Sequence, residues 1–172
     1  AVYFEKELLN ALKIIKDGHI KMSEMKGSWA GAMGQCQFMP SSFVKYAKDW
    51  NKDGKKDIWK TKADVFASAA NYLNQVGWNN NQTWGRKVFV KKNNKIKENV
   101  WQTIKDWKKL GLLNVDKSSL PDSSIKAKLI LDKKNKNHGF LVYSNFESIL
   151  KWNRSNYFAL AVGKLSDSIM KN

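Results

Sequence analysis

Oxygen-bearing side chains alternate in one short loop of this 172-residue chain. Asp49, Asn51 and Asp53 stand at every second position, and Gly54 follows at the sixth position of the loop. This spacing is that of the start of an EF-hand-type calcium loop, because calcium prefers six to eight oxygen ligands and the glycine allows a sharp turn. The twelfth position, where such loops usually carry a glutamate, is Lys60, and further lysines surround the loop. Two interpretations stay open: a calcium site, or a solvated Asn/Asp/Gly turn before a helix.

A run of small residues, Gly31 to Gly34, precedes this loop and leads into Gln37 and Phe38. Small residues let the backbone approach a ligand or another backbone closely. Pro40 followed by two serines predicts the start of a helix, since hydroxyl groups can accept from its free N–H groups. The segment is therefore either a tight structural turn packed on a core or the wall of a binding site. Periodicity alone favours the structural turn.

Taken together, Gly27 to Trp59 closely resembles the lytic murein transglycosylase B family, glycoside hydrolase family 103, whose members cleave the glycan strands of bacterial peptidoglycan. The likeness continues through Ala70 to Leu73 with Gly77-Trp78, and again through Lys151 to Ser155. It implies a mainly α (α+β) fold, namely part of a lysozyme-like transglycosylase domain with a small β-containing insertion.

The resemblance implies a sugar-binding groove with amide, hydroxyl and aromatic side chains, which suit sugar hydroxyls, N-acetyl groups and pyranose rings. Its substrate-binding residues would be Ser28, Met33, Gln37, Phe38, Tyr72, Trp152, Asn153 and Phe158. At Trp152 and Phe158 the family commonly has tyrosines, so this chain keeps the aromatic surface there but lacks two hydroxyls.

The resemblance also turns the acidic loop into an expected structural calcium site. Its ligands would be Asp49, Asn51, Asp53, the Lys55 carbonyl and Asp64, with one residue inserted before Asp64 relative to the family. No organic cofactor is expected.

A single glutamate does the chemistry in the family. It protonates the glycosidic oxygen between N-acetylmuramic acid and N-acetylglucosamine, and then takes the proton of the muramoyl C6 hydroxyl, which closes onto C1 as a 1,6-anhydromuramoyl end. The family's Glu-Ser/Thr-x-aromatic-Gly setting does not occur in these 172 residues. We therefore expect no catalytic residue in this chain, place the acid/base glutamate upstream of Ala1, and expect the chain alone to be inactive. Glu5 and Glu7 are expected on the solvated side of the first helix, and Glu24 lies just before the groove segment.

The chain is strongly basic, with 31 lysines and arginines against 15 acidic residues and a net charge of +16. Such a charge favours polyanionic partners. Only Arg86 and Arg154 are arginines, and no nucleic-acid-binding motif occurs, so we expect peptidoglycan glycan strands as the partner and no nucleic acid. The alternatives are a non-catalytic peptidoglycan-binding module and a basic nucleic-acid-binding domain.

Composition and cysteine content set further limits. The single cysteine, Cys36, excludes an internal disulfide, and no apolar run is long enough to span a bilayer. We expect a monomer in the bacterial periplasm or cell envelope, with membrane attachment only through an anchor outside this chain.

The chain is expected to form a single domain with three parts: the groove and metal loop at about 1–80, a mixed α/β part at about 81–143, and final helices at about 144–172. Helical periodicity places the core side of the first helix at Phe4, Leu8, Leu9, Leu12 and Ile15. The predicted helices cover about 4–16, 41–49, 63–76, 100–110, 144–152 and 156–168. The predicted strands cover 86–91, 127–131 and 140–143.

Overall fold

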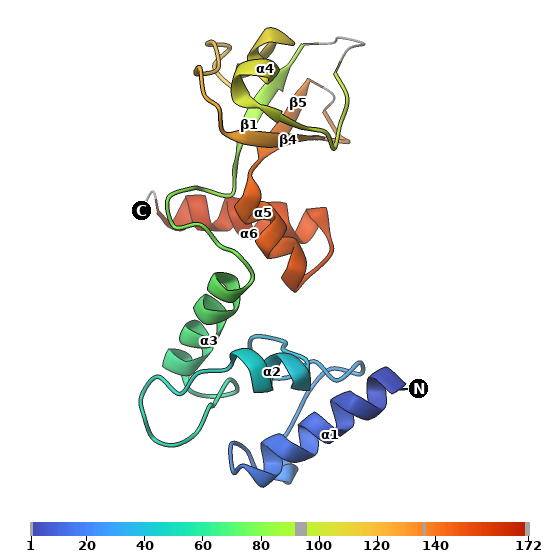
Figure 1. The fold of residues 1–172 in the computed structure, drawn as a ribbon, viewed down its shortest axis with the longest axis vertical. Helices are drawn as coiled ribbons and strands as arrows, with labels where there is room; N and C mark the ends of the chain where they lie inside the picture. The colour runs from blue at the N-terminus through green and yellow to red at the C-terminus, as the bar shows by residue number, and fades with distance from the viewer. Residues whose placement is uncertain (1, 92–95, 136, 171–172) are drawn as a thin grey trace. The chain divides into compact units, whose positions relative to one another are not determined.

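The computed structural model describes residues 2–91, 96–135 and 137–170. It divides into two compact units, Ala1–Val76 and Gly77–Asn172 (Figure 1). This division lies close to the expected boundary at about residue 80, and the grouping of both units as one domain stays a prediction. Among the described residues, no helix is long and apolar enough to cross a membrane.

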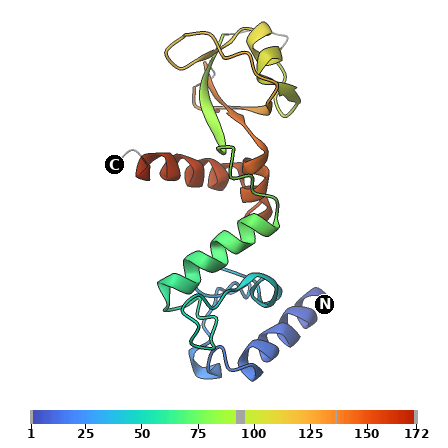
Figure 2. The same cartoon turned by 60° about the vertical axis from the view of Figure 1, so that its left-hand side comes forward.

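The first unit is helical, and its helices are α1 (Val2–Lys16), the 3-10 helix η1 (Met22–Glu24), α2 (Pro40–Tyr46) and α3 (Lys62–Gln75). Helix α2 packs against both α1 and α3 (Figures 1 and 2). Pro40 begins α2, where its missing N–H costs no hydrogen bond and its fixed φ suits the first turn. The helices predicted at about 4–16 and 63–76 are confirmed. The helix predicted at about 41–49 is confirmed only as far as Tyr46, because the backbone is extended at Ala47.

The buried face of α1 differs from the expected one. Ile14 and Glu7 are buried, whereas Leu8, Leu9 and Leu12 are more than half exposed. Helix α1 meets α2 through Glu7, whose carboxylate accepts hydrogen bonds from Ser41. Periodicity predicted the helix correctly, but it could not say which face the partner helix covers.

The second unit is built on a five-stranded antiparallel sheet with strand order β2-β4-β5-β1-β3. Its strands are β1 (Gly85–Val90), β2 (Trp101–Thr103), β3 (Leu112–Asn114), β4 (Lys126–Leu131) and β5 (His138–Val142). The predicted strand pair is confirmed, because β4 and β5 form an antiparallel hairpin in which Leu129 is opposite Leu141. Strand β3 was not predicted.

Three helices accompany this sheet: α4 (Ile104–Lys109), α5 (Ser144–Trp152) and α6 (Asn156–Ile169). The last two confirm the predicted final helices. The helix predicted at 100–110 is wrong in its first turn, because Trp101 to Thr103 pair with β4 instead. The Thr103 hydroxyl then accepts from the Asp106 N–H at 3.1 Å and starts α4.

Alternate residues along each strand point to opposite faces of the sheet, so the second unit has two cores. One is centred on Trp107 of α4, whose indole N–H donates to the Ala127 carbonyl at 3.0 Å. The other holds Trp84, Phe140 and residues of α5 and α6. Helix α6 lies directly on Trp84, because a Cβ at Gly163 would come within 2.3 Å of the indole ring.

Candidate functional site

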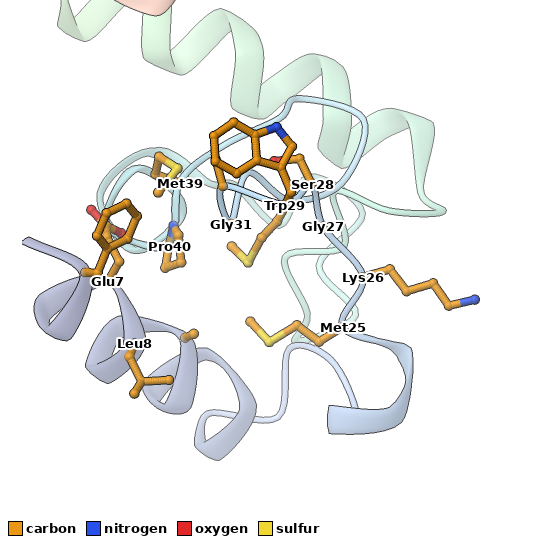
Figure 3. A pocket seen from close by; sticks show the side chains of 14 residues that line it. Glu7, Leu8, Met25, Lys26, Gly27, Ser28, Trp29, Gly31, Met39 and Pro40 are labelled. Atoms are coloured by element: carbon orange, nitrogen blue, oxygen red, sulfur yellow. The ribbon is translucent and has the colours of Figure 1, made fainter.

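A cavity of about 350 Å³ opens in the first unit between α1 and the loop that follows η1 (Figure 3). We call it the Trp29 cavity. Leu8 of α1 lines one side and Ser28 and Trp29 line the other, while Met25 points inward and Lys26 points away. The lining is mostly apolar, and the Trp29 side chain is 100% exposed. An exposed aromatic ring beside a hydroxyl group is suited to stacking on a sugar ring.

The loop that presents Trp29 is held by short-range hydrogen bonds. The Ser28 N–H donates to the Ala32 carbonyl at 2.8 Å, and the Ser28 hydroxyl accepts from the Ala32 N–H at 3.2 Å. Gly27 permits this closure, since a Cβ there would lie 2.7 Å from the Ala32 oxygen. The turn therefore holds the backbone on both sides of Trp29 while its ring stays in solvent.

Gly34 has a structural reason to be small. Its φ is +61°, and a Cβ would come within 2.6 Å of the Ile58 carbonyl oxygen. The neighbouring Gln35 N–H donates to this same carbonyl at 2.8 Å. This part of the small-residue run packs one loop of the backbone against another.

Of the groove residues expected in the first unit, Ser28 and Met33 line the Trp29 cavity. Gln37 does not line it. Gln37 is exposed, has a φ of +50°, and donates from Nε2 to the Gly34 carbonyl at 2.9 Å. One donor of its amide is thus engaged by its own turn.

Phe38 and Tyr72 belong to the interior of the first unit. Phe38 is 3% exposed, and its ring centroid lies 5.7 Å from that of Tyr72. Tyr72 also meets Tyr46 edge to face at 4.8 Å. Burial, and after it the charge of Tyr46, raises the pKa of Tyr72 above its ordinary value.

Trp152, Asn153 and Phe158 lie in the second unit, where α5 ends and α6 begins. Asn153 is exposed in the connection, and the Ser155 hydroxyl caps α6 by accepting from the Phe158 N–H at 3.3 Å. These three expected groove residues therefore lie in or beside the connection between α5 and α6, which we call the aromatic turn. The structure places Ser28 and Met33 in one cavity and this aromatic turn in the other unit.

The Glu7 carboxylate borders the Trp29 cavity but serves as an anchor (Figure 3). Glu7 is 7% exposed, and it accepts from the Ser41 N–H at 2.8 Å and from the Ser41 hydroxyl at 2.6 Å. The expectation that Glu7 lies on the solvated side of α1 is wrong, because both carboxylate oxygens are used to hold the start of α2.

The other glutamates are not placed as general acids either. Glu24 pairs with Lys60 at 2.9 Å, and this hydrogen bond holds the Glu24 pKa below its ordinary value, whereas a general acid needs a raised pKa. Glu147 pairs with Lys128 at 2.6 Å, and Glu98 accepts from the Leu131 N–H at 2.7 Å. Glu5 is exposed on α1.

The acidic loop is folded by its own side chains. The Asp49 carboxylate accepts from the N–H groups of Asp53 at 3.2 Å and Gly54 at 2.9 Å. Gly54 takes a φ of +87°, which the tight turn requires. The Asp53 carboxylate accepts from the Lys55 N–H at 2.8 Å, and this bond is the first cause of its lowered pKa.

Asp64 closes the loop from α3. It is 0% exposed, and its two oxygens accept from the Trp50 and Asp57 N–H groups, both at 2.8 Å. The donors of the expected calcium set are all oxygens, which fits that ion by type. Asp49, Asn51 and Asp53 come together at the loop, but the described residues contain no group of three His, Cys, Asp or Glu arranged to hold a metal.

Sequence reasoning missed two residues at this site. Trp29 had a visible signal, since it is a large aromatic residue among Ser28, Ala30 and Gly31. Glu7 had a weaker one, because it lies seven positions before the buried Ile14 and so on the same face of α1.

Residues 1–167 match the family described as Transglycosylase SLT domain. Over 172 residues the chain is 31% identical to Membrane-bound lytic murein transglycosylase B of Escherichia coli strain K12, covering 98% of this chain and 46% of that protein. The chain therefore spans about half the length of the curated relative it matches. These matches confirm the family resemblance that the sequence of Gly27 to Trp59 indicated.

Solved structures show the same likeness over nearly the whole chain. SltB3 of Pseudomonas aeruginosa, in complex with NAG-anhNAM-pentapeptide, matches with a TM-score of 0.88 and 42% identity over 95% of this chain and 45% of that one. The Escherichia coli lytic transglycosylase Slt35, in complex with calcium, matches with a TM-score of 0.83 and 28% identity over 99% of this chain and 54% of that one. The expected mixed helix-and-strand, lysozyme-like transglycosylase fold is confirmed.

Proposed function

We propose, on the premise that this chain belongs to the transglycosylase SLT domain family, that it is the glycan-binding part of a peptidoglycan lytic transglycosylase. The match over residues 1–167 carries this proposal. In the complete enzyme, the β-1,4 bond between N-acetylmuramic acid and N-acetylglucosamine would be cleaved without water. The muramoyl C6 hydroxyl replaces the leaving N-acetylglucosamine at C1, so the product ends in a 1,6-anhydromuramoyl residue.

The reaction needs one carboxyl group that first gives and then takes a proton. All five glutamates of this chain are described, and four of them are engaged in hydrogen bonds or ion pairs. Glu5 is exposed on α1 and so lies outside any buried, partly apolar site of the kind that suits a general acid. These placements support a glutamate supplied by polypeptide outside the 172 residues, and a chain that is inactive alone.

The proposed substrate contacts centre on the Trp29 cavity. Its exposed indole would stack on a sugar ring, and the Ser28 hydroxyl lies beside it. Met33 and Phe38 would provide apolar surroundings behind the sugar-binding groove. The Gln37 amide and the Tyr72 hydroxyl would be the polar groups nearby. Within the second unit, Trp152, Asn153 and Phe158 would offer a further sugar-binding surface.

A structural calcium ion is the second part of the proposal. Its support is the all-oxygen donor set and the calcium complex of the relative Slt35. Asp49, Asn51, Asp53 and the Lys55 carbonyl would hold the ion, with Asp64 completing the set. Bound calcium would supply charge neutralisation within the loop, and no catalytic step needs it.

The proposed location is the bacterial periplasm or cell envelope, where peptidoglycan lies. A relative carries the name membrane-bound lytic murein transglycosylase, and others are solved with peptidoglycan fragments. We propose a monomer that reaches a membrane only through an anchor outside this chain.

Sedimentation with purified murein sacculi tests the proposed function. The chain should co-sediment with sacculi, and this should persist when the peptides have been removed from the glycan. A salt-dependent gel shift with DNA, without binding to peptide-free glycan, would instead favour the basic nucleic-acid-binding alternative. Binding to glycan without product release by any N-terminally extended form would favour a non-catalytic binding module.

A further inference from the structure

The second unit contains a cavity of about 510 Å³ for which the proposed function has no role. We call it the Tyr157 cavity. Its lining comes from the segment before β2, from β4 and β5 with the turn between them, and from α6. All of these residues belong to one unit and to the described part of the chain.

The floor of this cavity is a fixed apolar surface. Ile130 and Phe140 come from neighbouring strands and belong to the core around Trp84. Helix α6 is held against that core at Gly163, and the Trp84 indole N–H donates to Asp167 at 3.1 Å. The cavity therefore lies between two elements whose packing fixes their separation.

The segment before β2 is also fixed in place. The Glu98 carboxylate accepts from the Leu131 N–H at 2.7 Å, and the Asn99 N–H donates to the Leu129 carbonyl at 3.0 Å. Asn99 takes a φ of +61°, a left-handed conformation that asparagine tolerates better than most residues. These two contacts attach the segment to β4 and keep its polar groups at the cavity.

Negatively and positively charged side chains both line the Tyr157 cavity. Glu98 and Asp132 supply carboxylates, and Lys133 and Lys164 supply ammonium groups. Within residues 2–91, 96–135 and 137–170, none of these four forms a salt bridge. Opposite charges that line one cavity without pairing can each bind an opposite charge on a ligand.

Tyr157 adds an aromatic surface to the opening. Its side chain is 71% exposed, and the Lys133 ammonium lies 6.0 Å from the ring centroid. The ring and the apolar floor can contact alkyl groups, while the charged groups contact the ends of the same ligand. A ligand that carries charges of both signs can form ion pairs with these four side chains, whereas a neutral sugar cannot.

We propose that the Tyr157 cavity binds the peptide stem of peptidoglycan, a short peptide with free carboxylates and a free amine. Lys133 and Lys164 would bind its carboxylates, and Glu98 and Asp132 its amine. That the peptide comes from peptidoglycan rests on the proposed function. That its charges match those of the cavity rests on the lining residues alone. Basic residues outnumber acidic ones more strongly in the second unit than in the first, which favours the approach of an anionic stem.

The test titrates the 172-residue chain with two probes: a free stem pentapeptide without sugar, and glycan strands stripped of peptide. The cavity variants are Lys164→Glu and Tyr157→Ala. Lys105→Glu on α4 is the matched control, because Lys105 is exposed, changes the net charge equally and lies outside the lining. Lys164→Glu should weaken pentapeptide binding at least about tenfold. The control should keep wild-type affinity, and all variants should bind stripped glycan equally.

Two results would overturn the cavity assignment: no pentapeptide binding by the wild-type chain, or equal affinity in the wild type and Lys164→Glu. Amide chemical-shift changes in the wild type provide a reading that needs no variant, and they should fall on residues 130–133 and 156–164. Changes elsewhere would also overturn it. Failure to bind stripped glycan counts against the proposed function alone, so the two failures are distinguishable.

Discussion

The Glu7 carboxylate closes the contact between α1 and α2 by accepting from both the backbone N–H and the hydroxyl of Ser41, at 2.8 and 2.6 Å. Ser41 is the second residue of α2, where backbone N–H groups have no partner within the helix. A buried glutamate beside the Trp29 cavity is thus accounted for by helix anchoring.

Replacing this carboxylate should destabilise the first unit. Glu7→Gln removes the charge and one acceptor, and we expect a loss of about 1–3 kcal/mol in the free energy of unfolding. Glu5→Gln, at an exposed position of the same helix, is the control and should change little. Denaturant titration of the three proteins measures the effect. Equal stability of Glu7→Gln and the wild type would show that the Ser41 contact is not an anchor.

The chain alone should release no anhydromuropeptides from murein, because its glutamates are engaged or exposed. A form extended at the N-terminus to include a glutamate in the family setting should release them, and replacing that glutamate by glutamine should abolish release. Mass analysis of the released products identifies the anhydro ends. Release by the highly purified 172-residue chain would refute this, and Glu7→Gln and Glu5→Gln would then be assayed for loss of activity.

Calcium should raise the melting temperature of the chain through the acidic loop. An ion that binds only the native state stabilises it by RT ln(1 + [L]/Kd), about 2.7 kcal/mol at a hundredfold excess over Kd. Neighbouring lysines weaken the affinity, so millimolar calcium should be needed. Asp53→Ala should abolish the shift. Asp116→Ala is the control, because Asp116 accepts from Ser118 in a comparable turn outside the loop. A calcium response that survives in Asp53→Ala would place the ion elsewhere.

Trp29→Ala should separate binding from stability. The side chain is fully exposed, so the melting temperature should stay near that of the wild type. Affinity for peptide-free glycan should fall about two- to tenfold, as expected for one lost aromatic stacking contact. Phe66→Ala, an exposed aromatic position on α3 that does not line the cavity, should retain binding. Equal losses in both variants would mean that Trp29 has no particular role.

Cys36 should be chemically inert in the native chain. Burial raises its pKa from 9.0 to about 11, and its thiol contacts the Val65 carbonyl at 3.5 Å. At pH 8 its alkylation should therefore be much slower in the folded chain than in denaturant. Because the folded-state pKa is raised, this thiol's stability contribution is complete below pH 9 and decreases as the pH rises toward 11. Similar alkylation rates in both states would contradict the burial.

Local sequence determined much of this protein. The helices α3, α5 and α6 and the hairpin of β4 and β5 follow from periodicity over whole elements, which local sequence records directly. The stretch from Gly27 to Trp59 carried the family resemblance, because its loop spacing and small-residue run are unusual together. Ser28 and Met33 of that same stretch line one cavity, and their part in sugar binding stays a prediction.

Tertiary structure decided the rest. Strands β2 and β3 are three residues each and exist only through pairing with β4 and β1, so their own sequences carry too little signal. Glu7 is buried instead of solvated because α2 supplies two hydrogen-bond donors from 34 residues away. Phe38 became interior because α3 brings Tyr72 to its ring. In each case a partner distant in sequence determines the environment, and side-chain type alone does not specify that partner.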